Sequence, residues 1–294
     1  MLTESKNTMS DQLQRFIFED YQIRGEIVQA HNSFSEIIKK HDYSAEVANL
    51  VGELLVATNL ITATLKFTGK ITVQLQGDGP LSLLVINANQ DQQVRGTARV
   101  TGDTLGLSFK QLVGKGHLMI TISPQEGEPY QGIIGLEKDS LSACLEDYFI
   151  RSEQLATRII LHANSTDTSQ AAGLLLQTLP AVNENHEQEF QHVCALASTV
   201  KEDELYTLSN DELLYRLYHQ EKVRLFDAQP ISFKCGCSRE RCLASLASIA
   251  PEEILDMLKE QGSIEMHCEY CGSDQHFEKD DVQILLGDSD ALQH

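Results

Sequence analysis

Four cysteines near the C-terminal end of this 294-residue chain have the spacing of a metal site. Cys235 and Cys237 form a Cys-x-Cys pair, and Cys268 and Cys271 form a Cys-x-x-Cys pair after thirty intervening residues. Two close pairs separated by a small insert commonly build tetrahedral zinc sites, and thiolates select zinc or an iron–sulfur centre over hard cations. The pattern predicts zinc. Four thiolates leave no position for a reacting water, so a catalytic metal is not expected.

Three other cysteines and one histidine are weaker candidates for ligands. His267 directly precedes Cys268, but in an extended segment its side chain would point to the opposite face. Cys242 falls in a predicted helix, "ERCLASLA", where a small buried thiol is the ordinary interpretation. Cys144 and Cys194 are isolated in the sequence and are predicted to be core or interface residues.

The residues around the cysteines predict a small domain at 231–294. Pro251 can open a helix, with Glu252 and Glu253 in its first turn. The stretch "SIEMHCEYCGSDQHFE" predicts a strand, a tight knuckle that ends at Gly272 and a returning strand, before a short helix, "KDDVQILL". So few core residues need a staple, and loss of the metal should unfold the domain.

The spacing of the thiols also permits redox chemistry. Oxidation of a ligating thiolate removes a metal ligand, and in each close pair a second cysteine stands ready to form a disulfide. A purely structural zinc site gains nothing from the tight Cys-x-Cys spacing. On the residues alone, a redox switch and a purely structural zinc domain both remain open.

Residues 1–180 predict an α+β domain with mostly antiparallel strands and flanking helices. Residues 15–28 are strand-like, with Gly25 at a bulge or bend, and 44–67 predicts a long buried helix. The segment 170–180, "QAAGLLLQTLP", predicts a helix that ends at Pro180. Further strands are predicted at 70–76, 81–88, 92–100, 105–113 and 117–124.

Residues 181–230 predict an acidic helical linker. Thr199 with Glu202, and Ser209 with Glu212, have the capping-box spacing of a helix start. An apolar stripe at helical spacing follows in Leu213, Leu214, Leu217 and Tyr218. Helices this short are marginal in water, so they should gain stability by laying the stripe on another element, and they should be easily released.

The composition argues against several partners. There are 43 Asp and Glu against 23 Lys and Arg, a net charge of −20, so neither nucleic acid nor an anionic membrane is an expected partner. A nucleic-acid zinc ribbon is disfavoured because 231–294 carries thirteen acidic residues and five Lys or Arg. No membrane span and no secretory signal are expected, so the predicted location is the cytoplasm, where thiols stay reduced.

The order of several motifs resembles the bacterial redox-regulated holdase chaperone family called heat shock protein thirty-three. The cysteine pattern follows an acidic linker, and three other stretches match: "DQLQRFIFED" (11–20), "GEPYQGIIGLE" (127–137) and "YFIRSEQLATRI" (148–159). The resemblance covers nearly the whole chain. Two departures are an eight-residue extension before Met9, an alternative start, and Gln275 in place of a frequent aromatic.

The resemblance implies a mechanism and a set of residue roles. Cys235, Cys237, Cys268 and Cys271 would hold one Zn²⁺ per chain in a reduced, monomeric, inactive form. Hypochlorite, or peroxide with unfolding stress, would join Cys235 to Cys237 and Cys268 to Cys271 and release zinc. The C-terminal domain and linker would then unfold, and a dimer would bind unfolding client proteins without ATP. On this interpretation the protein is not an enzyme.

Two enzymatic functions are alternatives. A thiol–disulfide oxidoreductase would use Cys268 and Cys271, although Glu269 inside the motif is expected to raise the thiol pKa. A hydrolase is weakly supported, because its candidate residues lack nucleophile-elbow spacing: His117, His162 and Ser152.

Overall fold

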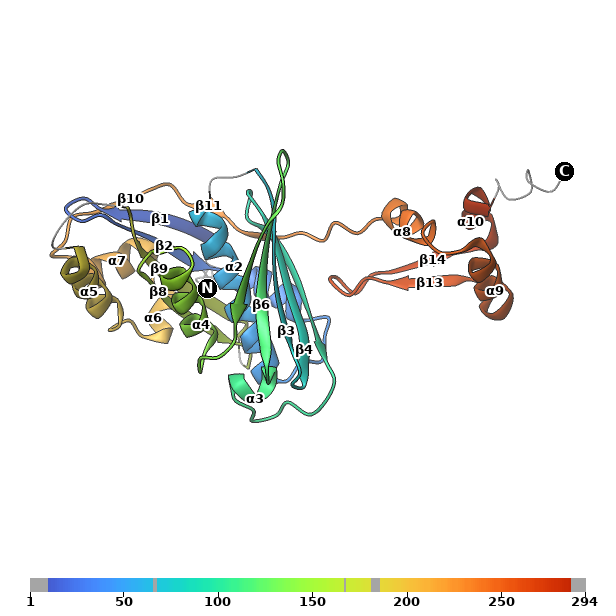
Figure 1. Cartoon of the computed structure of the whole chain (residues 1–294), viewed down its shortest axis with the longest axis horizontal. Coiled ribbons are helices and arrows are strands. Elements are labelled where there is room, and N and C mark those ends of the chain that lie inside the picture. The colour runs from blue at the N-terminus through green and yellow to red at the C-terminus, as the bar shows by residue number, and fades with distance from the viewer. Residues whose placement is uncertain (1–9, 66–67, 167, 181–185, 287–294) are drawn as a thin grey trace, which may run out of the picture. The chain divides into compact units, whose positions relative to one another are not determined.

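A computed structural model of the chain describes most of the protein (Figure 1). The described residues are 10–65, 68–166, 168–180 and 186–286. The chain divides into two compact units, Met1–Lys234 and Cys235–His294. The alternative start at Met9 lies outside the described residues. The architecture is α+β, as predicted, and the three-part division at 180 and 230 stays a prediction.

Two six-stranded sheets form the scaffold of the first unit. Sheet 1 has the order β10-β1-β2-β9-β8, with β11 also paired to β1, and its strands are β1 (Gln12–Phe18), β2 (Ile23–Gln29), β8 (Thr157–Asn164), β9 (Gln170–Thr178), β10 (Val223–Leu225) and β11 (Gln229–Pro230). Sheet 2 has the order β12-β5-β4-β3-β6-β7, and its strands are β3 (Gly69–Gly77), β4 (Leu81–Asn89), β5 (Gln93–Val100), β6 (Gly116–Pro124), β7 (Tyr130–Gly135) and β12 (Ser232–Phe233). Among the described strands, all pairs are antiparallel except β12–β5.

The long helix α2 (Ala45–Thr64) lies between the two sheets and contacts strands of both. Ser44 caps its start by accepting a hydrogen bond from the Val47 N–H. No membrane span was expected, yet α2 is long and apolar enough to cross a bilayer; 78% of its most apolar window is buried inside the protein. The other helices of this core are α1 (His31–Ile38), α3 (Phe109–Val113) and α4 (Leu141–Arg151).

Three helices of the predicted linker cover the face of sheet 1 that is turned away from α2 (Figure 1). They are α5 (His186–Ala197), α6 (Glu202–Thr207) and α7 (Asn210–Tyr218). The predicted stripe on α7 is confirmed, because its four apolar side chains are all buried in this contact. Under the helices lies an apolar surface, here called the sheet-1 platform, made of Phe16, Phe18, Ile23, Ile27, Ala172, Leu174 and Leu176.

One of the two predicted capping boxes is confirmed. Ser209 and Glu212 exchange hydrogen bonds at the start of α7. The prediction for Thr199 and Glu202 was wrong: the Thr199 hydroxyl donates back to the Leu196 carbonyl at the end of α5. Helix α6 begins after Lys201, whose N–H donates to the Glu204 carboxylate at 2.8 Å.

Two elements were predicted with the wrong type. Segment 170–180 contains strand β9, not a helix; Leu175 faces the core around α2, whereas Leu174 and Leu176 face the linker helices. With both faces buried, this strand shows no polar alternation. Segment 105–113 is a loop followed by α3, not a strand.

Gly25 does not form the predicted bulge but pairs in register with Phe16 in the β1–β2 hairpin. An added Cβ would lie 2.1 Å from Cζ of Phe16, whose ring is fully buried. We therefore expect Gly25→Ala to lower the free energy of unfolding by about 1–3 kcal/mol, the usual cost of overpacking. Urea titration followed by circular dichroism measures this change. As a control, Gly102→Ala places its Cβ 3.7 Å from Pro80 and should leave the urea midpoint unchanged; equal midpoints for both variants would contradict the packing argument.

The second unit is small, and the predicted elements around the cysteines are confirmed. Its elements are α8 (Arg239–Leu246), α9 (Pro251–Gln261), β13 (Ile264–His267), β14 (Asp274–Phe277) and α10 (Lys279–Leu286). Pro251 opens α9 as expected. Among the residues of this unit whose side chains the structure describes, the buried core consists of Leu246, Ile254, Ile264, Phe277 and Val282. Five such side chains make a weak core for a unit of this length, so a staple is needed.

Candidate metal centre

The first cysteine pair lies in an extended loop between β12 and α8. Gly236 separates the two cysteines, and its carbonyl accepts a hydrogen bond from the Arg241 guanidinium. Ser238 then caps α8 by accepting from the Arg241 N–H at 3.3 Å. The turn and the helix start together fix the direction of the loop that carries Cys235 and Cys237.

The second pair lies in a knuckle between β13 and β14. The Cys268 carbonyl accepts from the N–H groups of Cys271 (3.3 Å) and Gly272 (2.8 Å), and the Cys268 N–H donates to the Ser273 carbonyl. Gly272 has a φ of +66°, a left-handed conformation that favours glycine. The knuckle thus turns both thiols of this pair to the same side.

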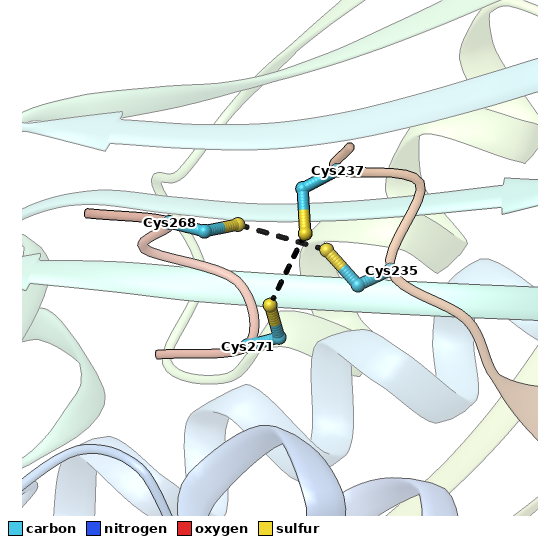
Figure 2. A group of neighbouring side chains, drawn as sticks. All are labelled: Cys235, Cys237, Cys268 and Cys271. Atoms are coloured by element: carbon cyan, nitrogen blue, oxygen red, sulfur yellow. Dashed lines mark hydrogen bonds between the residues drawn. The ribbon is translucent and has the colours of Figure 1, made fainter. Parts of the chain in front are cut away.

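The four thiols converge on one point (Figure 2). Sγ of Cys235 lies 3.6 Å from Sγ of Cys268, Sγ of Cys237 lies 3.4 Å from Sγ of Cys271, and all four sulfurs are within 4.8 Å of one another. All are free thiols. Tetrahedral zinc with Zn–S bonds of about 2.3 Å requires sulfurs about 3.8 Å apart. The donor set and its spacing therefore fit a tetrahedral metal ion.

The electrostatics of the cluster favour a bound cation. Burial raises the pKa of the Cys235 thiol to about 12 and also raises the pKa of Cys268. For Cys271, burial acts in the same direction, but hydrogen bonds from Ser273 and from neighbouring thiols lower the pKa to about 6. These hydrogen bonds decide the pKa of Cys271, so the rise expected from Glu269 does not prevail there. A divalent cation would supply the charge that lets the remaining thiols ionise.

Ser273 was not singled out from the sequence. Its hydroxyl lies 3.2 Å from Sγ of Cys271 and 3.5 Å from Sγ of Cys237, so it contacts one thiol of each pair. A serine two residues after a cysteine is too common to carry a signal. Only the folded knuckle brings it to the cluster.

The other candidate ligands lie outside the cluster. His267 is exposed and its Nδ1 lies 2.6 Å from the Asp274 carboxylate across the hairpin. Cys242 packs on α8 against the small core of the second unit. Cys144 and Cys194 are buried in the first unit, as predicted for core residues.

The hydrolase candidates are not assembled into a site. His117 lies in β6 of sheet 2, His162 lies in β8 of sheet 1, and Ser152 follows α4. Within the part of the chain that the structure describes, no hydrogen bond joins any two of them.

Comparison with known proteins places the chain in a family. The Hsp33 protein family matches residues 11–278, which covers both sheets, the linker and the cysteine cluster. The chain belongs to the Hsp33 family. This confirms the resemblance seen in the sequence, and Hsp33 is a chaperone family.

Individual Hsp33 relatives are similar over nearly their whole length. A 33 kDa chaperonin of Aeromonas salmonicida is 50% identical over 286 residues, which are 96% of this chain and 97% of that protein. A 33 kDa chaperonin of Cronobacter sakazakii is 52% identical over 274 residues, 92% of this chain and 94% of that protein. These relatives come from bacteria.

A solved Hsp33 structure has the same fold. The crystal structure of the 33 kDa chaperonin of Thermotoga maritima, at 21% sequence identity, superimposes with a TM-score of 0.81 and covers 95% of this chain and 99% of that one. At this identity the likeness concerns the fold alone.

Proposed function

We propose that this protein is a redox-regulated, ATP-independent holdase chaperone of the bacterial cytoplasm. In the reduced form, Cys235, Cys237, Cys268 and Cys271 hold one Zn²⁺, and the linker helices cover the sheet-1 platform. Oxidation removes the ligands, the second unit unfolds, and the linker leaves the platform, which then binds unfolding proteins. The observation that carries the proposal is that short helices cover the apolar sheet-1 platform. In the chain, these helices directly precede the small unit that contains the four-cysteine cluster.

The weak core of the second unit supports coupling between metal and folding. Its five fully described buried side chains are few for its length. Binding of zinc to thiolates contributes on the order of 10–16 kcal/mol in small zinc domains, and this is folding free energy. A unit that depends on its ligands in this way unfolds when the ligands are oxidised.

Hypochlorite is the oxidant in the proposed reaction, and the reaction balances. Four thiolates and two HOCl give two disulfides, two chloride ions and two hydroxide ions, and a Zn²⁺ held by these thiolates would lose its ligands with no change of oxidation state. Each disulfide forms with the loss of two electrons, which reduce one HOCl. We propose the pairs Cys235–Cys237 and Cys268–Cys271. In the reduced cluster Sγ of Cys235 also lies 3.6 Å from Sγ of Cys268, and Sγ of Cys237 lies 3.4 Å from Sγ of Cys271, so peptide mapping of the oxidised protein is needed to test the proposed pairing.

The platform has the chemistry of a client-binding surface. Its aromatic and aliphatic side chains are buried in the contact with α5–α7. Exposed, they would form a continuous apolar patch of the kind that binds other proteins. An exposed patch would also favour association of two chains, so we propose a monomer when reduced and a dimer when oxidised. Size-exclusion chromatography with light scattering tests this.

The deciding experiment is suppression of aggregation. A chemically denatured client is diluted into buffer, and its light scattering is followed with the reduced, zinc-loaded protein and with the same sample after hypochlorite. We expect only the oxidised sample to suppress scattering, without ATP. Treatment with a thiol reductant and zinc should restore the inactive form. If neither sample suppresses scattering, the cysteine cluster is a structural zinc site and the holdase proposal fails.

A thiol–disulfide oxidoreductase is the alternative, favoured by the lowered pKa of Cys271. Such an enzyme needs an accessible thiolate, whereas Cys271 is partly buried among three other thiols and Ser273. Catalytic turnover of a small disulfide would support this function. A stoichiometric reaction that ends after two disulfides per chain supports the switch.

A further inference from the structure

His31 joins the linker to the core through both ring nitrogens. It is the first residue of α1, and its ring lies edge-on to the Tyr206 ring of α6, with centroids 6.1 Å apart. The Ala171 N–H of β9 donates to Nδ1 at 3.2 Å, and Nε2 lies 3.2 Å from the Tyr206 carbonyl. An N–H only donates and a carbonyl only accepts, so the ring must be neutral with its proton on Nε2.

The same short helix has a second polar attachment. Gln29, the last residue of β2, donates to the carbonyls of Leu205 and Leu208, both at 2.9 Å. Helix α6 has six residues and cannot be stable alone. Its attachment to the core depends on the burial of Leu205 and Tyr206 and on the side-chain bonds from His31 and Gln29.

The surroundings of His31 disfavour its protonated form. Burial lowers its pKa, against smaller opposing effects of the Asp11 carboxylate and of the Tyr206 carbonyl. Asp11 is already engaged by the N–H groups of Asn32 and Ser33 in the first turn of α1. A helix N-terminus also repels a cation. From strand β9 the Ala171 N–H faces the ring, and it is another donor.

Two further acids lie near this contact. The Tyr206 hydroxyl donates to Glu202 at 2.8 Å. On α2, burial raises the pKa of Glu53 to about 7. The charge of this carboxylate also raises the pKa of the Tyr206 hydroxyl, so Glu53 faces the same contact. Burial favours the neutral carboxyl of Glu53, and acid favours it too, so the titration of Glu53 stabilises the closed state at low pH. This sign is opposite to that of His31.

We propose that His31 is an acid-sensitive latch that releases α6 from the core when the imidazole is protonated, without oxidation of any cysteine. A proton on Nδ1 would face the Ala171 N–H, which leaves two buried donors without an acceptor. The sign follows from linkage: since closure lowers the pKa of His31, docking is strongest above about pH 6.5, the pKa of a free histidine, and weakens as the pH falls below it.

Hydrogen–deuterium exchange of peptides spanning 202–208 tests the latch in the reduced full-length protein supplied with one equivalent of Zn²⁺. After correction for intrinsic exchange rates, opening of α6 should increase about tenfold or more between pH 7.5 and pH 5.5, because protonation leaves two buried donors, the His31 Nδ1–H and the Ala171 N–H, without an acceptor. A colorimetric chelator records whether zinc stays bound at each pH. No client protein is needed, so failure of the holdase test would not affect this result.

Four variants separate His31 from other acid effects. His31→Gln cannot titrate and keeps an amide that can donate to the Tyr206 carbonyl, so it should stay closed at both pH values. His31→Phe keeps a ring but loses both hydrogen bonds, so it should be open at both. His192→Gln changes the exposed linker histidine that pairs with Glu221 and should keep the acid response. Glu53→Gln removes the opposing group and should enlarge the response.

The thiols are identical in all these proteins, so acid loss of zinc cannot imitate the expected pattern. Acid opening of the His31→Gln variant equal to that of the parent protein would overturn the proposal. So would ¹⁵N NMR of the reduced protein that gives His31 a pKa at or above 6.5, or a ring proton on Nδ1 at neutral pH.

Discussion

Replacement of Cys268 and Cys271 by serine is expected to abolish binding of the metal and to unfold the second unit. The variant keeps only Cys235 and Cys237, and two thiolates do not complete a tetrahedral site. The lost binding free energy, on the order of 10–16 kcal/mol, exceeds what the five buried side chains in the described core of this unit can replace. The zinc content measured by metal analysis should fall from one ion per chain to none. The NMR resonances of the second unit should shift to random-coil positions.

Cys242→Ser is the matched control for this experiment. Cys242 lies on α8 of the same unit, next to its small core and outside the thiol cluster. This variant should retain one zinc per chain and a folded second unit. A double variant at Cys268 and Cys271 that still binds one equivalent of zinc tightly would show that the ligands have been assigned wrongly.

The second large effect is expected in the linker. Leu213 and Leu217 of α7 are buried on the sheet-1 platform. Removal of each side chain to alanine costs about 2–5 kcal/mol in a well-packed core. The double variant should therefore release the linker while the cysteines remain reduced and zinc stays bound. We expect this reduced protein to suppress client aggregation and to be cleaved rapidly by protease between 186 and 218.

Tyr215→Ala provides the control on the same helix. Tyr215 is 75% exposed and points away from the platform, so its removal should leave the reduced protein inactive and protease-resistant. If the Leu213 and Leu217 double variant is released from the platform but does not suppress aggregation, the platform is not the client-binding surface. If it stays closed, the linker is held by more than its apolar stripe.

Local patterns predicted the second unit well and the first unit unevenly. The knuckle needed a glycine after Cys271, and the strands beside it alternate, so short-range rules sufficed. Strand β9 was mistaken for a helix because the linker covers the face that would otherwise carry polar residues. Strand β7 was missed because an exposed edge strand with two glycines has the composition of a loop.

Only the part of the candidate site that depends on the spacing of residues along the sequence could be predicted. The convergence of the four thiols followed from two close pairs and a plausible insert. The contacts of Ser273 with the thiols depend on the folded knuckle. His31 meets Ala171 and Tyr206 across 140 and 175 residues of sequence, a distance over which no periodicity or motif carries information.

The last strands of the first unit, β10, β11 and β12, follow one another at the edges of the two sheets: β12 on β5, then β11 and β10 on β1. Each is only two or three residues long. Tension applied to the chain at Lys234 would therefore act first on the hydrogen bonds of β12, then on those of β11 and finally on those of β10. The strands would be peeled off one after another and not sheared off together. Detachment should run backward along the sequence, β12 first and α7 only after β10. An unfolded second unit would therefore exert its tension on β12 first, and through β11 and β10 on the linker helices.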